Sequence, residues 1–303
     1  MSSSPIEATG YNMRNIAYLY VALTVFLWSS VAAVGKLLLK NLDNFQVMFY
    51  VLLTATAGLL AILLLNKKLK EVAKYKLKDY LNFAYMGFLG IFLYNVLFFA
   101  ALMYSPAQEA FIVNYTWPIW VVIFASLILK EKFTFKKLIA IILGFTGVYI
   151  VATNGNLMSF TINNLKGDIL ALTGAVSYGL FSVLGKKDNY DKTASMFFYH
   201  LFGFIFAIPT VLIFSKIVTI SPPQLGGLIW IGTFTTGIAF TFWFLALKYG
   251  DTARMSNIIF LTPFMSLIWI YFLLGEKVLL SSIIGLALIV AGIIIQSGKK
   301  AKP

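Results

Sequence analysis

The stretch AQEAFIVNYTWPIWVVIFASLILKEK at residues 107–132 recurs in related form as TARMSNIIFLTPFMSLIWIYFLLGEK at residues 252–277. Each copy is apolar over about the 20 residues that a helix needs to cross a bilayer. Each carries one proline, Pro118 or Pro263, and closes on Glu-Lys at the same distance from it. The two copies lie 145 residues apart, and the same offset relates further identical pairs: Gly87 and Gly232, Tyr104 and Tyr249, Gly147 and Gly292. The chain therefore consists of two related halves.

The composition indicates that most of the surface faces lipid. Of 303 residues, 60% are hydrophobic and 12% are charged, and a typical soluble domain carries about twice that charged fraction. The first thirteen residues lack the basic region, apolar region and cleavage site of a signal peptide, so we expect no removable signal peptide. The chain has no cysteine, which excludes disulfides, thiolate metal sites and cysteine nucleophiles.

Apolar stretches of membrane-crossing length follow one another along the whole chain, separated by short polar turns. No segment alternates with the period of two that a membrane β-barrel requires. We predict an all-α integral membrane protein with ten transmembrane helices, at residues 16–35, 45–65, 81–103, 107–129, 136–153, 167–185, 194–214, 225–247, 252–274 and 279–297.

The distribution of lysine and arginine predicts the orientation, because cytoplasmic loops are enriched in both residues. If the N-terminus is cytoplasmic, nineteen of the 24 basic residues fall on the cytoplasmic side. We therefore expect a multi-pass protein of the plasma membrane with both termini in the cytoplasm. This placement accounts for the net charge of +13 without a nucleic acid as partner. The five basic residues on the other side are Lys36, Lys40, Lys166, Lys216 and Lys277.

Five helices per half is an odd number, so the second half enters the membrane from the side opposite to the first. The predicted organisation is a cytoplasmic tail (1–15), a first repeat (16–153), a second repeat (167–297) and a second cytoplasmic tail (298–303). Inverted repeats of this kind are frequent in transporters, with the substrate site near mid-membrane between the halves. The topology alone predicts an alternating-access carrier.

Specific motifs strengthen this interpretation. The first half contains Phe99-Ala100-Ala101-Leu102-Met103-Tyr104, then Pro118, Leu129-Lys130-Glu131-Lys132 and Gly144-Phe145-Thr146-Gly147. The second half contains Leu245-Ala246-Leu247-Lys248-Tyr249, then Pro263, Gly275-Glu276-Lys277 and Gly292. Together with the opening Leu27-Trp28-Ser29-Ser30 and the following Gly35-Lys36, these segments resemble the EamA domain of the drug/metabolite transporter superfamily. The family more often has glycine where Ser29 stands, and Gly179 supplies it in the second half.

The resemblance covers nearly the whole chain. It implies ten helices, a central cavity and export of small metabolites such as amino acids, with the lipid bilayer as surroundings. It does not fix the substrate, since members of the family differ widely in what they carry. A homodimer is compatible with it, and import as against export is undecidable from the residues.

The eleven acidic residues all fall in tails, loops or helix ends, so no carboxylate is predicted at mid-membrane. This argues against a cation antiporter built on a buried glutamate and favours uniport, exchange or weak proton coupling. The candidates for coupling or charge recognition are His200, Glu109 and Arg254. Each has a structural alternative: a histidine bonded to a neighbouring helix, a carboxylate at a helix N-terminus, and a basic topology anchor.

Uncharged polar and aromatic residues within the helices mark a substrate cavity, because polar groups in a bilayer usually face the protein interior. Asparagine amides bind both the carboxylate and the ammonium of a zwitterion, and aromatic faces take a cation or an apolar group. The alternatives are interhelical hydrogen bonds for the asparagines and lipid or interfacial packing for the aromatics. The predicted substrate-binding residues are Trp28, Tyr94, Asn95, Asn114, Trp117, Ser256, Asn257 and Thr262.

The two matched prolines are predicted to shape the same cavity. Pro118 and Pro263 each remove a helix hydrogen bond near mid-span. Their corresponding positions predict paired kinks that bend two helices round the cavity. The alternative is an inherited kink without a role in gating.

Other functions have less support in the sequence. A multidrug or organic-cation exporter is the main alternative, and the lack of a central carboxylate counts against it. An intramembrane enzyme is a distant alternative, because the chain has one histidine and neither HExxH nor CxxC. A receptor role stays open. We expect no metal and no cofactor.

Overall fold

The computed structural model describes residues 5–104, 110, 113–153, 155–156, 158, 164–275 and 280–297, and every regular element within them is helical. The first half contains α1 (Pro5–Ser29), α2 (Val31–Leu38), α3 (Asn44–Leu65), α4 (Leu69–Val72), α5 (Leu77–Met86), the π-helix η1 (Gly87–Leu93), α6 (Tyr94–Tyr104), α8 (Trp117–Ile128) and α9 (Phe135–Ala152). The second half contains α10 (Leu165–Lys187), α11 (Lys192–Phe214), α12 (Pro222–Ile229), the π-helix η2 (Trp230–Ile238), α13 (Ala239–Tyr249), α14 (Thr252–Ile259), α15 (Leu261–Leu274) and α16 (Leu280–Ser297).

Aspartates begin three of these helices. Asp43 and Gln46 form a reciprocal capping box at the start of α3, with side-chain to backbone distances of 2.9 and 3.0 Å. Asp191 accepts the backbone N–H of Ala194 at the start of α11, and Asp251 caps α14 through its Oδ1. Acidic residues that the sequence placed in loops and at helix ends therefore stabilise helix N-termini.

The helices are long and apolar enough for a multi-pass membrane protein. Large apolar side chains such as Phe214 and Phe272 lie exposed on their outer faces, as expected for a surface in lipid. Two shorter apolar helices, 117–128 and 283–295, add to the longer ones. Seven helical runs in the described residues reach membrane-spanning length, at Asn15–Leu38, Asn44–Leu65, Leu77–Phe98, Leu165–Lys187, Lys192–Phe214, Pro222–Tyr249 and Thr252–Leu273. The expected all-helical membrane fold is confirmed at this level, and the count of ten spans stays a prediction.

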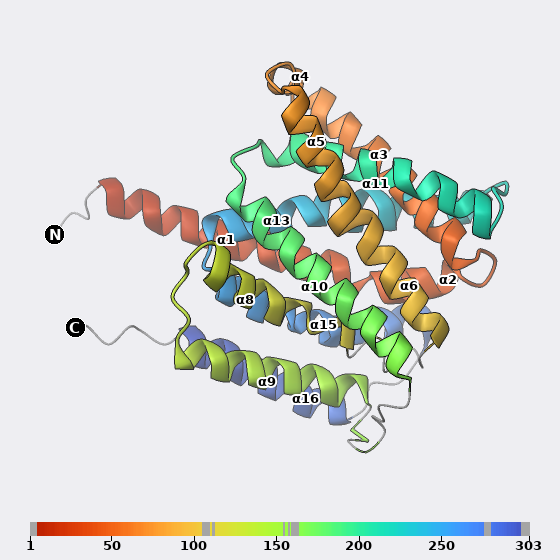
Figure 1. The fold of residues 1–303 in the computed structure, drawn as a ribbon. Helices are drawn as coiled ribbons and strands as arrows, with labels where there is room; N and C mark the ends of the chain where they lie inside the picture. The colour runs from red at the N-terminus through yellow and green to blue at the C-terminus, as the bar shows by residue number, and fades with distance from the viewer. Residues whose placement is uncertain are drawn as a thin grey trace.

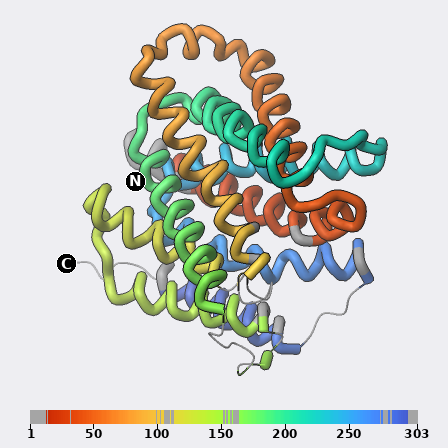
Figure 2. Tube along the Cα trace, turned by 45° about the vertical axis from the view of Figure 1, so that its right-hand side comes forward, coloured from red at the N-terminus to blue at the C-terminus, as the bar shows by residue number. Residues whose placement is uncertain are grey.

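The helices pack as a bundle with one distinct pair. α9 lies along α16 at one side of the bundle in Figure 1 and still beside it in the turned view of Figure 2, and both helices contact α14 and α15. Small residues allow this close approach, since a Cβ at Gly147 would lie 2.5 Å from the carbonyl oxygen of Gly285. In the rest of the bundle α3 packs on α11 and η2, α1 on α13, and α10 on α6 and α8.

Interruptions occur at corresponding places in the two halves. α8 begins at Trp117, directly before Pro118, and α15 begins two residues before Pro263, because proline cannot donate the hydrogen bond that would continue a preceding helix. The π-helices η1 and η2 likewise lie in corresponding segments, and such stretches are frequent at functional sites. One interruption has no counterpart: α1 ends at Ser29 and α2 starts at Val31, whereas α10 is continuous.

Candidate functional site

A cavity of about 520 Å³ lies among the interrupted helices. Its mouth is formed by exposed residues of α2 and the following turn, including Lys36 and Leu39. From there it extends inward to Trp117 and Tyr178, which are buried. Among the described residues that line the cavity none is acidic, and Lys36 is the single basic one. A cavity of this size is in the range of small-molecule binding sites.

Trp28 lies at the junction of α1 and α2, which several tryptophans hold in place. Its indole Nε1 donates to the carbonyl oxygen of Thr235 in η2 at 2.9 Å. Trp269 donates to Ser29 Oγ at 2.9 Å, and Trp230 donates to Ser30 Oγ at 2.8 Å. The side chains of Trp28, Ser29 and Ser30 at the interruption are therefore hydrogen-bonded, and Trp28 lines the cavity.

Polar residues from α6 and the segment before α8 form one wall. Asn114 Nδ2 donates to the hydroxyl oxygen of Tyr94 at 3.2 Å. Asn95 Nδ2 donates to the carbonyl oxygen of Ile91 at 2.6 Å, so its amide is fixed to its own helical run. Thr262, at the start of α15, also lines the cavity beside Pro263.

The inner end of the cavity is a cluster of edge-to-face rings. The ring centroids of Trp117 and Tyr178 are 4.9 Å apart at an interplanar angle of 84°. Trp28 approaches Phe240 at 5.4 Å, and Phe240 approaches Tyr178 at 5.6 Å. Such arrangements bring the positive edge of one ring to the negative face of the next, so the cluster makes an apolar floor with defined geometry.

The structure brings six of the eight predicted binding residues to this cavity: Trp28, Tyr94, Asn95, Asn114, Trp117 and Thr262. Ser256 and Asn257 do not line it. Asn257 is fully buried between helices, with its amide oriented so that Nδ2 donates to Ala140 O at 3.0 Å and Oδ1 accepts from Ile293 N at 3.2 Å. Asn257 thus bonds α14 to α9 and α16, which is the interhelical role considered as its alternative.

Two of the three predicted coupling and charge residues also lie elsewhere. His200 is fully buried in α11, where Nδ1 is 2.7 Å from the carbonyl oxygen of Met196. It does not line the cavity and reaches it through its ring contact with Phe240. Arg254 follows the N-cap of α14 and is likewise outside the cavity lining. Glu109 lies outside the described residues.

Sequence reasoning missed Tyr178, Phe240 and Lys36 as lining residues. A signal for Tyr178 existed, because near the start of each half the repeat offset is 150, which places Tyr178 opposite Trp28. The structure brings these two related residues into contact, with ring centroids 6.3 Å apart. Phe240 and Lys36 had signals of the same kind: Phe240 corresponds to Asn95 at the offset of 145, and Lys36 corresponds to Lys186 at the offset of 150.

The end of the molecule opposite the mouth is closed by ion pairs. α3 begins at Asn44, which lines the cavity, and ends at Leu65, so its 22 residues span about 33 Å at 1.5 Å per residue. Beyond it, Lys68 Nζ lies 2.6 Å from Asp191 Oδ2. The lysine-rich connections of the chain therefore lie together at this end, which we call the lysine-rich end.

Two further ion pairs at this end, like that of Lys68 with Asp191, connect the halves. Lys186 Nζ donates to Glu131 Oε1 at 2.8 Å and to Thr252 Oγ1 at 2.7 Å, and the Thr252 hydroxyl itself donates to Glu131. Lys137 Nζ lies 2.8 Å from Asp251 Oδ2. Burial alone would raise the pKa of Asp251, but the hydrogen bond from Lys137 and its positive charge outweigh this and hold that pKa below its usual value.

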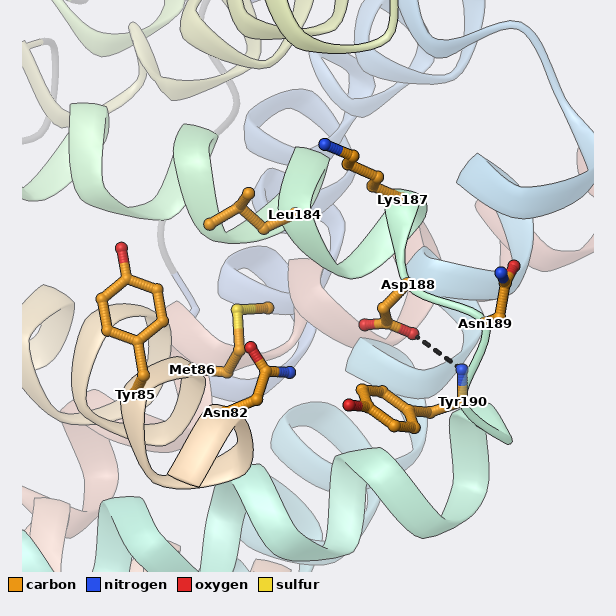
Figure 3. Close-up of a pocket in the computed structure, with 8 residues that line it drawn as sticks. All are labelled: Asn82, Tyr85, Met86, Leu184, Lys187, Asp188, Asn189 and Tyr190. Atoms are coloured by element: carbon orange, nitrogen blue, oxygen red, sulfur yellow. Dashed lines mark hydrogen bonds between the residues drawn. The ribbon is translucent and has the colours of Figure 1, made fainter. Parts of the chain in front are cut away.

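A second hollow, of about 660 Å³, lies at the lysine-rich end. Figure 3 shows Asn82 and Tyr85 of α5 on one side and Leu184 and Lys187 of α10 on the other. Its acidic residue, Asp188, is already used: it accepts from the backbone N–H of Tyr190 at 3.2 Å and pairs with Lys192. This hollow is a structural junction between α5, the end of α10 and the connection at residues 188–190, and the cavity at the mouth is the candidate functional site.

Comparison with known proteins agrees with this architecture. The model of the EamA-like transporter family matches residues 15–153 and again residues 165–298. An uncharacterized transporter of Archaeoglobus fulgidus is 27% identical over 292 residues, covering 95% of this chain and 99% of that protein. The uncharacterized transporter YyaM of Bacillus subtilis is 29% identical over 251 residues, covering 80% and 81%. A solved crystal structure superposes with a TM-score of 0.82 at 20% identity, covering 93% of this chain and 97% of the other, and shows the same fold.

Both matched segments are assigned to one transporter family, and they cover most of the chain. Both relatives are named as transporters, and the matches cover 99% and 81% of their lengths. The protein is thus a transporter and not an enzyme, and the resemblance seen in the sequence is confirmed: the chain belongs to the EamA-like transporter family.

Proposed function

We propose that this protein exports small metabolites such as amino acids across the plasma membrane by alternating access between two inverted five-helix repeats. Transport is uncoupled or weakly coupled to protons. The observation that carries the proposal is the one-sided cavity, open at the mouth beside Lys36 and closed at the lysine-rich end by ion pairs between the halves. Alternating access requires such a state and its mirror image.

The closure beyond the cavity floor supports this reading. Trp243 is fully buried and donates through Nε1 to Ser182 Oγ at 3.1 Å. Phe181 and Phe244 are fully buried beside it, with ring centroids 5.0 Å apart. A substrate in the cavity is separated from the lysine-rich end first by this apolar layer and then by the ion pairs.

The pairing of helices supports the inverted repeat. In the first half α1 packs on α13 of the second, and the corresponding helix α10 packs on α6 of the first. α3 packs on η2, and its counterpart α11 packs on η1. α9 and α16 correspond to each other and pack together, as do α3 and α11. Each of these contacts therefore has an equivalent contact when the first half is exchanged with the second, as a two-fold relation requires.

The charges of the cavity support a substrate of low net charge. The described lining residues offer amides, hydroxyls and aromatic faces but no carboxylate. A buried organic cation without a counter-charge is costly, so the alternative of a multidrug exporter for lipophilic cations is disfavoured. Amino acids are neutral overall at pH 7 and carry both hydrogen-bond donors and acceptors.

The position of His200 supports weak or absent proton coupling. Its imidazole is separated from the cavity by Phe240 and bonded to its own helix. A proton on His200 would therefore have no direct contact with a bound solute. Exchange or uniport follows most simply from these contacts.

Flux of a labelled amino-acid panel in proteoliposomes, with and without a pH gradient, tests the proposal. We expect at least one amino acid to be transported, with little gradient dependence, and flux to be lost in Asn114→Ala. Asn257→Ala is the matched control, because the same substitution there lies outside the cavity. Normal flux in well-folded Asn114→Ala would remove the cavity assignment, and transport of tetraphenylphosphonium alone would favour the multidrug alternative.

The topology is tested separately. Because the chain has no native cysteine, single cysteines placed in the turns at 131–132 and 276–277 report membrane sidedness with an impermeant maleimide. The inverted repeat requires opposite sides, with the first turn and both termini in the cytoplasm. Labelling of both turns from one side would refute it.

A further inference from the structure

Three buried polar atoms in the cavity wall have no hydrogen-bond partner among the described residues: Asn114 Oδ1, the hydroxyl of Tyr178 and Thr262 Oγ1. The first two adjoin Tyr94, whose hydroxyl accepts from the Asn114 amide and whose ring packs against that of Tyr178. Asn114 is 4% exposed and Tyr178 is 2% exposed, and both line the cavity. Buried polar atoms are normally satisfied, so an unpaired pair at one place in a binding cavity indicates a ligand group.

The orientation of Asn114 is fixed by its other amide atom. Nδ2 donates to Tyr94 OH at 3.2 Å, so Oδ1 is left as a pure acceptor. The rings of Tyr94 and Tyr178 have centroids 4.9 Å apart, which brings the two walls together at this point. The Tyr178 hydroxyl can accept one hydrogen bond and donate another.

We propose that Asn114 Oδ1 and the Tyr178 hydroxyl bind the ammonium group of a zwitterionic amino compound, and that Asn114 sets the net charge the carrier accepts. The inference rests on the proposed function and names the substrate group that this site recognises. The two oxygens accept N–H bonds from the ammonium, while the Tyr178 O–H donates to the neighbouring carboxylate of the same α-amino acid. The faces of Trp28 and Trp117 contact the remainder of the molecule.

A neutral acceptor pair explains why a zwitterion fits better than a simple amine. An ammonium bound to two uncharged oxygens keeps its full charge, and no described lining residue supplies a carboxylate. In a zwitterion the substrate's own carboxylate compensates that charge within the cavity. An anion without N–H donors leaves Asn114 Oδ1 unpaired, so it binds more weakly as well.

Three probes that share one side chain separate these contributions. They are L-leucine, isoamylamine (leucine without its carboxylate) and 4-methylpentanoate (leucine without its ammonium). Binding to the detergent-purified full chain is read from tryptophan fluorescence, since Trp28 and Trp117 line the cavity. For the wild type we expect leucine to bind at least about tenfold more tightly than either analogue, the size of one charge-assisted hydrogen bond.

Two substitutions test the assigned roles. Asn114→Asp supplies a carboxylate of the same shape, so isoamylamine should become the best of the three probes, with its affinity raised about tenfold. Tyr178→Phe removes only the hydroxyl and should reduce the preference for leucine over isoamylamine by about fivefold. Asn95→Asp is the matched control: it adds the same charge to the same cavity wall, at a side chain that is bonded to its own helix, and should not invert the ranking.

The outcomes separate this inference from the proposed function. If the wild type shows the expected ranking but transports none of the probes, the ammonium site stands and the transport proposal fails. If leucine is transported but an Asn114→Asp protein with unchanged melting temperature keeps the wild-type ranking, the inference is wrong. Failure of Asn114→Asp to fold leaves Tyr178→Phe to decide, and an unchanged preference there also overturns it, as would an absence of leucine binding to the wild type.

Discussion

Replacing Lys186 with methionine removes the cation at the centre of the lysine-rich end. Its Nζ donates to Glu131 Oε1 at 2.8 Å, to Thr252 Oγ1 at 2.7 Å and to Gly250 O at 3.1 Å. The two charged side chains are 15% and 23% exposed. An exposed pair contributes up to about 1 kcal/mol, whereas removing one partner of a buried pair costs about 3–5 kcal/mol.

The magnitude for Lys186→Met lies between these limits. Glu131 keeps the hydrogen bond from the Thr252 hydroxyl at 2.6 Å and regains water when the lysine-rich end opens. We therefore expect the closed state to lose about 2 kcal/mol relative to the open one. That corresponds to a shift of about thirtyfold in the equilibrium between the two states.

Maleimide labelling of a Ser182→Cys protein measures this shift. Ser182 lies one helical turn before Lys186, is fully buried, and accepts a hydrogen bond from Trp243. With no native cysteine in the chain, all label is at this position. When reagent is supplied from the lysine-rich side, its rate of reaction follows the fraction of open molecules, so Lys186→Met should raise it about thirtyfold.

Lys74→Met is the control for this experiment. Its ion pair with Glu71 is formed within one connection, and the two side chains are 66% and 42% exposed, so the labelling rate should not change. The double variant Glu131→Gln/Lys186→Met should label no faster than Lys186→Met, because the pair is already broken. A Lys186→Met protein whose Ser182→Cys labelling equals that of its parent would refute the gating role of this contact.

Three further predictions concern the same architecture. Because Lys137 holds the pKa of Asp251 below its usual 3.8, the contribution of this pair is complete above that value and is lost only as pH falls through the lower folded-state pKa. Maleimide reacts with the thiolate, so the Ser182→Cys labelling rate is divided by that of an exposed cysteine at Lys74→Cys; this ratio should be flat between about pH 5 and 8, and a steep change of the ratio near pH 7 would contradict the prediction. Gly147→Ala places a Cβ 2.5 Å from Gly285 O and should lower the free energy of unfolding by about 1–3 kcal/mol, whereas Gly226→Ala, with nothing within 4 Å, should not; melting temperatures in detergent compare the two. Lys192 is 3% exposed and pairs with Asp188, so Lys192→Met should cost about 3–5 kcal/mol; a melting temperature equal to the wild type would show that Asp188 is satisfied without it.

The positions of the helices follow closely from the sequence, because apolar length and turn residues are local signals. The span predicted at 194–214 is observed at Lys192–Phe214, and that predicted at 45–65 is observed at Asn44–Leu65. The interruption of the first long helix at Ser29 and Ser30 was not predictable in this way. Neither serine breaks a helix by itself, and it is hydrogen bonds from Trp269 and Trp230, more than 190 residues away, that hold the interruption.

The same limitation explains which site residues were misplaced. The reasoning that placed Asn257 and Thr262 in one cavity wall treated residues 252–274 as one helix. The chain is interrupted at Phe260, between α14 and α15, so the angular relation between residues on either side is no longer set by 3.6 residues per turn. Thr262 lines the cavity, while Asn257 faces α9 and α16.

The two ends of the repeat are chemically unequal, and this inequality gives the proposed cycle a resting state. At the offset of 145 residues, Asp251 and Thr252 correspond to Pro106 and Ala107, and Lys137 corresponds to Ser282. Lys186 corresponds to Lys36 at the offset of 150, and Glu131 corresponds to Glu276 at the offset of 145, so this pair keeps its charges. Its neighbours Asp251, Thr252 and Lys137 do not recur in the other half. Closing the lysine-rich end thus gains more ion pairs and hydrogen bonds than closing the mouth. An empty carrier should therefore rest with its mouth open, and a substrate shifts it only by binding the opposite state more tightly.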